Sequence, residues 1–316
     1  MTIGKHVTQF AGLPCFPFEE GEPLPADDHP PIAWRVESWE EDMGDWEEGR
    51  PSPTFRQEFE SFLDTVDPAT VTALVIGSWG YAAFNIAPIE QLCAAASRLT
   101  NLRALFLGDI TYEECEISWI KQGDLTPLLA AYPDLEVLRV RGTDGLELTP
   151  VRHTALRELA FESGGLPATV VRAVGECDLP ALEHLELWLG SSYYQGDATV
   201  ADLAPILAGT RLPALRHLGL RDAEITDEIA AELGTAPVVA RLDTLDLSMG
   251  ALGDEGVAAL LAGQPLTHLR RLDLHHHFVG EESAARLTAA LPNVEVDLSD
   301  PQQPDGDGDR YVAVSE

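Results

Sequence analysis

The sequence predicts an α/β solenoid, in which a curved parallel sheet lines the concave side and helices cover the convex side. Three observations lead to this prediction. The pattern L-x-x-L-x-L recurs along most of the chain, the last full copies stand 27 residues apart, and segments with apolar residues at helical spacing follow the copies. Self-similarity at a period of about 20 to 50 residues is typical of solenoids, whose units bury their apolar faces against one another.

The repeats divide into close copies, loose copies and one truncated unit. Close copies are Leu102-Leu105-Leu107, Leu182-Leu185-Leu187, Leu215-Leu218-Leu220, Leu242-Leu245-Leu247 and Leu269-Leu272-Leu274. Loose copies are Val71-Leu74-Ile76, Leu135-Leu138-Val140 and Leu156-Leu159-Phe161, and the truncated unit is PNVEVDLSD at residues 292–300. Residues 69–300 are therefore predicted to form a leucine-rich-repeat solenoid of about eight full repeats plus a truncated one.

One unit, residues 242–263, illustrates the expected fold of a repeat. Leu245 and Leu247 alternate with polar neighbours, as in a strand with one buried face. Asp254 and Glu255 suit the start of a helix, where acids complement the helix dipole. Comparable helices are predicted within residues 87–99, 167–175, 199–209 and 225–234.

Two units depart from this scheme. The segment GTDGLELTPVRH, residues 142–153, is too short for a full helix. The segment TYEECEISWIKQ, residues 111–122, is an insertion, and insertions in repeat arrays often lie on one face and serve binding. The alternative for this insertion is an ordinary loop with Trp119 packed against the body.

The two ends lack the repeat. Residues 1–29 form an acidic, proline-rich segment, and residues 301–316 form an acidic tail. Residues 30–68 are predicted to be an N-terminal cap, with a strand at 32–38 and an amphipathic helix at 55–66, because a solenoid needs a cover for its first apolar face. Trp39 and Trp46 are expected to pack on this cap, and the alternative is that they anchor a partner.

Composition excludes several classes of function. The chain has 53 acids and 20 bases, and its formal charge of -33 repels phosphate, so nucleic acid and anionic membranes are not expected as partners. No segment has the apolar character of a signal peptide or of a membrane span. The four cysteines stand far apart and are expected to be free thiols in a cytoplasmic protein.

The repeat LDLSMGALGDEGVAALL at residues 245–261 resembles the ribonuclease-inhibitor-like class of leucine-rich repeats, which supports the predicted fold. The whole chain resembles an uncharacterised bacterial leucine-rich-repeat family through RALFLGDITYEECEISWI, LRELAFESGGLP, DATVADLAPILAGTRLPALRHLGL and RLDLHHH. Members of that family tend to be encoded beside radical-SAM and ATP-grasp proteins, and the resemblance implies an accessory role in a peptide-modifying pathway. This chain has neither a C-x-x-x-C-x-x-C triad nor a glycine-rich phosphate loop.

The concave face is the expected binding surface. Outward positions of neighbouring strands form columns, because adjacent strands lie about 4.8 Å apart. A rigid polar face with arginines around an aromatic anchor, Trp188, predicts a protein or peptide partner and no enzymatic activity. The predicted partner-binding residues are Arg139, Arg141, Glu158, Glu162, His184, Glu186, Trp188, His217, Arg221, Asp246, Arg271, Asp273 and His275.

An alternative hypothesis is an enzyme or metal-dependent protein with a site around His184, Glu186 and His217. Two imidazoles and a carboxylate are ligands that Zn²⁺ accepts, and the same groups serve acid and base chemistry. No catalytic signature such as G-x-S-x-G or H-E-x-x-H accompanies them. The sequence therefore predicts no catalytic residue, no cofactor and no metal.

Two further acidic or histidine-rich stretches are predicted not to be metal sites. In LDLHHHFVGEE, His275 is expected on the concave face, His276 in the turn and His277 facing inward, so the three do not converge. In DGDGDRYVAVSE, residues 305–316, acids match several positions of a calcium loop, but Arg310 stands where that loop requires glycine.

Overall fold

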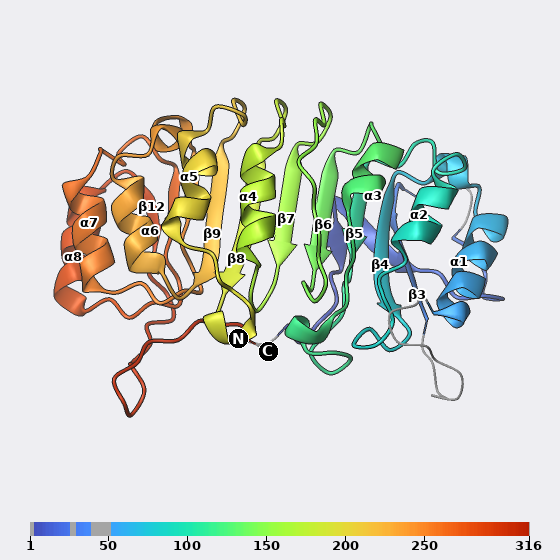
Figure 1. Cartoon of the computed structure of the whole chain (residues 1–316), viewed down its shortest axis with the longest axis horizontal. Helices are drawn as coiled ribbons and strands as arrows, with labels where there is room; N and C mark the ends of the chain where they lie inside the picture. Colours follow the sequence, from blue (N-terminus) through green and yellow to red (C-terminus); the bar gives the residue numbers. More distant parts are fainter. Residues whose placement is uncertain (1–2, 26–29, 39–51, 316) are drawn as a thin grey trace. The chain divides into compact units, whose positions relative to one another are not determined.

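The computed structural model describes residues 3–25, 30–38 and 52–315. The chain forms two compact units, Ile3–Glu158 and Leu159–Glu316. Within the described residues there are twelve strands and eight α-helices, and strands and helices largely alternate along the chain (Figure 1). None of the helices among these residues is both long enough and apolar enough to span a membrane.

In the N-terminal unit, six strands are hydrogen-bonded in chain order. They are β1 (Gln9–Phe10), β2 (Leu13–Pro17), β3 (Ala33–Ser38), β4 (Ala73–Trp79), β5 (Ala104–Leu107) and β6 (Val137–Arg141). β1 and β2 are antiparallel, and each later pair is parallel. The helices are α1 (Pro53–Thr65), α2 (Ile89–Ala95) and α3 (Thr126–Ala131), with 3-10 turns η1 (Pro68–Thr70) and η2 (Ile117–Trp119).

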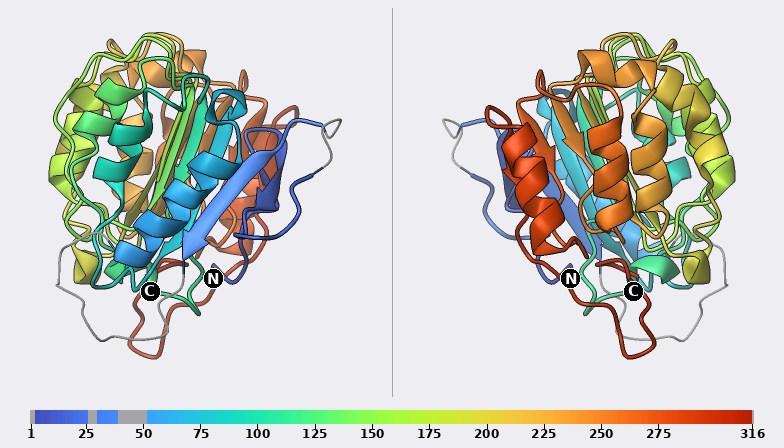
Figure 2. Two further views of the ribbon diagram at one scale, coloured as in Figure 1. Left: turned by 90° about the vertical axis from the view of Figure 1, so that its right-hand side faces the viewer. Right: turned by 90° about the vertical axis from the view of Figure 1, so that its left-hand side faces the viewer.

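The expected strand and helix of the cap are both observed, as β3 and α1. Ser52 caps α1 by accepting a hydrogen bond from the backbone N–H of Phe55. The ring of Phe62 packs against Trp34 of β3 and against Phe18, with centroids 5.9 Å and 5.3 Å away. Figure 2 (left) shows α1 beside the strands of this unit. Trp39 and Trp46 lie outside the described residues.

The first 29 residues do more than form an acidic segment, because β1 and β2 extend the sheet. Phe10 of β1 is 6% exposed and lies 5.8 Å from the ring of Phe106 of β5. These strands were not predicted, since neither shows an alternation of apolar and polar residues long enough to indicate a strand.

In the C-terminal unit the strands are β7 (Glu158–Glu162), β8 (His184–Gly190), β9 (His217–Ala223), β10 (Thr244–Asp246), β11 (Arg271–Asp273) and β12 (Glu295–Asp297). Its helices are α4 (Ala168–Glu176), α5 (Val200–Ala208), α6 (Thr226–Leu233), α7 (Asp254–Ala262) and α8 (Glu281–Ala290), with η3 (Ser192–Tyr194) and η4 (Pro237–Arg241). The pairs from β8 to β12 are all parallel. The helices α6 to α8 cover one side of these strands (Figure 2, right).

The unit at residues 242–263 folds as the sequence predicts. Leu245 and Leu247 are fully buried, and α7 begins with Asp254 and Glu255 in its first turn. Neighbouring parallel strands must be joined by a long crossover connection, and a helix on one side of the strands supplies that connection here. As expected, the described segment between β6 and β7 contains no helix.

The apolar end of the C-terminal tail packs against its own unit. Val312, Ala313 and Val314 are all at most 9% exposed. The backbone N–H of Ala313 donates to the carbonyl of Met249 over 2.8 Å, and that of Val314 donates to Asp222 Oδ1 over 2.9 Å. These bonds hold an apolar segment that follows an exposed acidic loop.

Candidate functional site

The strand register of the C-terminal unit brings the predicted columns together. His184 pairs with His217, His217 with Thr244, and Thr244 with Arg271. In the next column Glu186 pairs with Gly219, Gly219 with Asp246, and Asp246 with Asp273. The leucine spacing predicts that these outward residues lie side by side, and this prediction is confirmed from β8 to β11. We call the side chains of these columns, with Trp188, Arg221, Ser248 and His275, the polar face.

Trp188 lies on the polar face but is buried, with 7% of its surface exposed. Its indole Nε1 donates to Glu186 Oε1 over 2.7 Å, and the guanidinium of Arg221 lies 5.2 Å from the centre of its ring. A tryptophan covered by an arginine offers little apolar surface to a partner. Trp188 therefore holds Glu186 and Arg221 in place, and its contact with a partner as an apolar anchor would require Arg221 to move.

Arg221 connects three neighbouring strands. Its Nη1 donates to Glu186 Oε1 over 2.8 Å, and its Nε donates to Ser248 Oγ over 3.0 Å and lies 3.4 Å from Asp246 Oδ2. Burial alone would lower the pKa of Arg221, but the charges of Glu186 and Asp246 raise it. Burial raises the pKa of Asp246, against the effect of Arg221. Because these ion pairs are poorly solvated, they hold the side chains of Arg221, Glu186 and Asp246 in one geometry.

At the other end of the polar face, Arg271 and His275 share Asp273. Arg271 Nη2 donates to Asp273 Oδ2 over 2.8 Å and to Asp297 Oδ2 over 2.9 Å. His275 Nδ1 lies 2.7 Å from Asp273 Oδ1, and this hydrogen bond raises the pKa of His275. Burial favours a higher pKa for Asp273, yet the bonds from His275 and Arg271 hold that pKa below its usual range.

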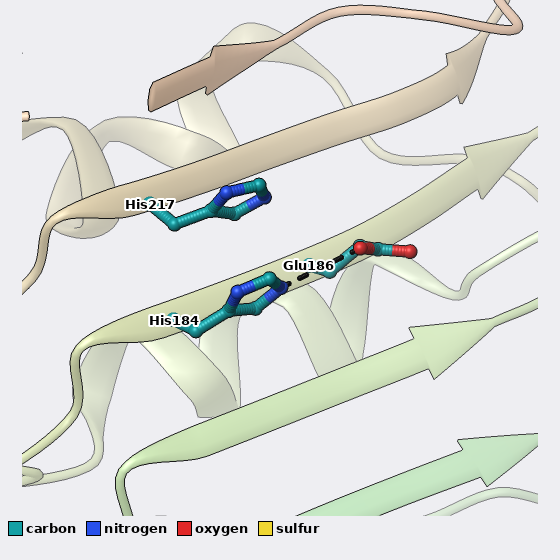
Figure 3. Close-up of side chains that lie close together, drawn as sticks. All are labelled: His184, Glu186 and His217. Atoms are coloured by element: carbon teal, nitrogen blue, oxygen red, sulfur yellow. Dashed lines mark ion pairs between the residues drawn. The ribbon is translucent and has the colours of Figure 1, made fainter. Parts of the chain in front are cut away.

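His184, Glu186 and His217 form a third group on the polar face (Figure 3). The two imidazole rings stack with centroids 3.8 Å apart and planes at 6°. His184 Nε2 lies 3.5 Å from Glu186 Oε2. Burial, followed by the charge of His184, lowers the pKa of His217 to about 4, so this imidazole is neutral at pH 7.

The predicted residues of β6 and β7 are less accessible. Arg139 Nη2 donates to Glu158 Oε1 over 3.2 Å, and both side chains are half-buried. Arg141 is 4% exposed and Glu162 is 3% exposed. Direct contact of these two with a partner would require the surrounding side chains to move.

The sequence did not reveal a buried ionic cluster in the N-terminal unit. Asp109 is fully buried and accepts from Arg35 Nη1, from Arg141 Nη1 over 3.3 Å and from the backbone N–H of Val7 over 3.2 Å. His6 Nε2 lies 3.2 Å from Glu114 Oε1 at the edge of this cluster. The two guanidinium groups of Arg35 and Arg141 offset the cost of burying the side chain of Asp109.

The insertion at 111–122 forms part of a pocket of about 330 Å³ in the N-terminal unit. Tyr81, Tyr112 and Trp119 line it and are 47%, 44% and 56% exposed, so Trp119 does not pack fully against the body. Glu113 and Glu116 also line it. The insertion was the only sequence signal for this pocket, because Tyr81 lies in another segment.

The three consecutive histidines separate as predicted. His275 is half-buried on the polar face, whereas His276 and His277 are 5% and 3% exposed. His276 adopts a φ of 56°, and its Nε2 lies 3.3 Å from the carbonyl of Tyr311. His277 Nδ1 accepts from the backbone N–H of Val279 over 3.0 Å, so this inward histidine satisfies the turn.

The acidic loop of the tail is bonded to its own backbone. Asp305 Oδ1 accepts from the backbone N–H groups of Asp307 and Asp309, both over 2.9 Å. Arg310 Nη1 donates to Asp227 Oδ2 over 2.8 Å. Glu316, which would supply the last ligand of a calcium loop, lies outside the described residues.

Comparison with solved structures shows what the chain is similar to. No family model matches the chain, and no curated protein matches it. Among solved structures, the chain is similar to the crystal structure of a protein from Bacteroides fragilis, with 30% sequence identity and a TM-score of 0.73. The match covers 82% of this chain and 73% of that one, and the name of that protein states no activity. At this identity and coverage, the chain belongs to the same family as the Bacteroides fragilis protein.

Proposed function

We propose that this chain is a cytoplasmic leucine-rich-repeat protein of the ribonuclease-inhibitor-like class that binds a protein or peptide without catalysing a reaction. The repeated leucine spacing and the strand-and-helix units support the repeat class. Free cysteines at Cys15, Cys93, Cys115 and Cys177 are in keeping with a reducing compartment.

The polar face of β8 to β11 is the observation that carries this proposal. Without a partner, the side chains of this face are already held by hydrogen bonds to one another. Arg221, for example, is held by Glu186 and Ser248. A surface whose rotamers are fixed loses less conformational entropy on binding than a mobile one. His184, His217, Thr244, Arg271 and His275 remain half-buried, so each offers some surface to a partner.

The aromatic pocket of the N-terminal unit favours a basic partner. Exposed rings at Tyr81, Tyr112 and Trp119, next to Glu113 and Glu116, suit a lysine or arginine side chain through cation–π and ionic contacts. The formal charge of -33 attracts a basic segment at long range. The partner we propose is therefore a protein or peptide with an exposed basic stretch, and the chain would serve as an accessory protein that holds it.

Affinity capture from the source organism tests the polar face. Arg271→Gln removes one charge from that face, and Arg270→Gln is the matched control, because Arg270 precedes β11 and its side chain is 84% exposed. We expect Arg271→Gln to weaken binding of a purified co-captured chain about tenfold, the effect of losing roughly 1.4 kcal/mol. Equal binding by both variants would contradict the use of this face.

A second pair of variants tests the pocket. Trp119→Ala should weaken the same interaction, whereas Tyr193→Ala, which alters an aromatic side chain that is 86% exposed elsewhere, should leave it unchanged. The interaction should also weaken as salt is raised, because the charges at the pocket are screened within about 10 Å at 0.1 M salt. Binding that changes neither with Trp119→Ala nor with added salt would contradict a basic partner.

A further inference from the structure

Two imidazole nitrogens on the polar face have no hydrogen-bond partner among the described residues. These are Nε2 of His184 and Nε2 of His217, and both atoms are buried. His184 Nε2 is 3.5 Å from Glu186 Oε2, but the contact lacks hydrogen-bond geometry. Buried polar atoms in folded proteins almost always have a partner, so two orphaned nitrogens side by side need an explanation.

The register of the strands explains why the two nitrogens lie together. His184 and His217 begin β8 and β9 and are paired directly. Their rings therefore stack, and both present Nε2 on the side toward Glu186, which follows His184 by two positions on the same face of β8 (Figure 3). Three donor atoms from these residues lie within 4.8 Å of one another.

Glu186 is held so that one oxygen is fixed and the other faces the histidines. Its Oε1 accepts from Arg221 Nη1 over 2.8 Å and from Trp188 Nε1 over 2.7 Å. Outer hydrogen bonds of this kind orient the carboxylates that bind metal ions. The positive charge of Arg221 would repel a cation, but Asp246 lies 3.4 Å from its Nε and offsets that charge.

We propose that His184 Nε2, His217 Nε2 and Glu186 Oε2 bind one Zn²⁺ ion, with water at the remaining position. Two histidines and a glutamate form an established donor set for Zn²⁺, with bonds of about 2.0 to 2.2 Å. The bound ion gives both orphaned nitrogens a partner. Binding tilts the two rings out of their parallel stack, because both lone pairs must point at one ion.

The other two groups of possible ligands in the described chain are less suited to an ion. In the group Asp273, His275 and Asp297, the His275 ring is bonded to Asp273, and Arg271 occupies both carboxylates. In the group His6, Glu37 and Glu114, Arg35 donates to both His6 and Glu37. An ion at either place would have to displace an arginine that is already paired.

The test is a zinc titration of the whole chain, after removal of any purification tag and of bound metal with a chelator. Isothermal titration with zinc chloride should show one ion per chain. His184→Ala, His217→Ala and Glu186→Gln should each weaken binding at least tenfold, whereas His275→Ala, which alters a neighbouring histidine of the polar face, should not. Circular dichroism and the thermal midpoint establish that each variant is folded.

Cobalt substitution provides a measurement on the unaltered chain. Co²⁺ at this site should give visible d–d absorption of a four- or five-coordinate ion, and one equivalent of Zn²⁺ should abolish it. No binding by the unaltered chain at 100 µM zinc chloride (about 5.5 kcal/mol) would overturn the proposal, as would binding that His184→Ala and His217→Ala leave unchanged. No partner protein is needed, so the outcome does not depend on the function proposed above.

Discussion

The carboxylate of Asp222 accepts a hydrogen bond from the backbone N–H of Val314, a residue 92 positions later in the chain. Asp222 is fully buried in β9 and has a φ of 53°, and burial raises its pKa well above the usual range. The side chain of Asp222 thus holds the tail against the C-terminal unit, but its carboxyl group is poorly solvated there.

Asp222→Asn should stabilise the protein at pH 7. Asparagine keeps the oxygen that accepts from Val314, tolerates a positive φ and does not ionise. Because the pKa of Asp222 is higher in the folded than in the unfolded state, its contribution to stability is lost as pH rises through the folded pKa. Urea unfolding should show a gain on the order of 1 kcal/mol at pH 7 that disappears near pH 4.

The matched variant Asp222→Ala should have the opposite effect. It removes the acceptor and leaves the N–H of Val314 buried without its partner, which costs about 1 to 3 kcal/mol. Two variants that are equally stable at pH 7 would contradict the assigned role of the bond.

Removing residues 311–316 should destabilise the C-terminal unit. Val312 and Val314 are 8% and 2% exposed, and their burial contributes about 3 kcal/mol in total. The loss also removes Tyr311, whose ring lies 5.1 Å from that of Phe278. Thermal unfolding should show a lower midpoint, while Asp307→Ala in the exposed loop should leave the midpoint unchanged.

Asp109→Ala should destabilise the N-terminal unit strongly. The change leaves Arg35 and Arg141, which are 6% and 4% exposed, without the carboxylate between them. Breaking a buried ion pair in this way costs about 3 to 5 kcal/mol. Urea unfolding measures the loss, and Glu113→Ala, at an exposed acid of the same unit, is the control that should change little.

In metal-free protein, His217 should make the folded state sensitive to mild acid. Its folded pKa of about 4 lies below the value of about 6.5 for an unfolded chain, so stability is fully present above pH 6.5 and is lost as pH falls toward 4. Allowing for partial exposure, the loss should be about 2 kcal/mol. His217→Gln does not titrate, and urea unfolding between pH 7 and pH 4 should show a smaller loss for this variant.

The repeat pattern was enough to predict which residues of neighbouring strands lie side by side. Leucines at Leu218, Leu245 and Leu272 set the register because each must face the buried side, and a slip of one residue would expose them. The pairing of His184 with His217 follows from the same rule. The face and its columns could therefore be predicted from the sequence.

The accessibility of that face could not be predicted. Trp188 is covered because Arg221 and Glu186 reach it from two strands, and side-chain conformations of this kind do not follow from spacing. The docked tail depends on Asp222, which looks like an ordinary strand residue in the sequence. β1 and β2 pair with the sheet, and no local pattern of their residues predicts this pairing.

The bond between Asp222 and Val314 also has a kinetic consequence. From β8 to β12, each strand pairs with the next strand in the chain, so these contacts need only short loops and can form in sequence. The tail contact spans 92 positions and closes a much larger loop. It should form after the folding transition state, so that removing the tail speeds unfolding while the refolding rate stays nearly constant.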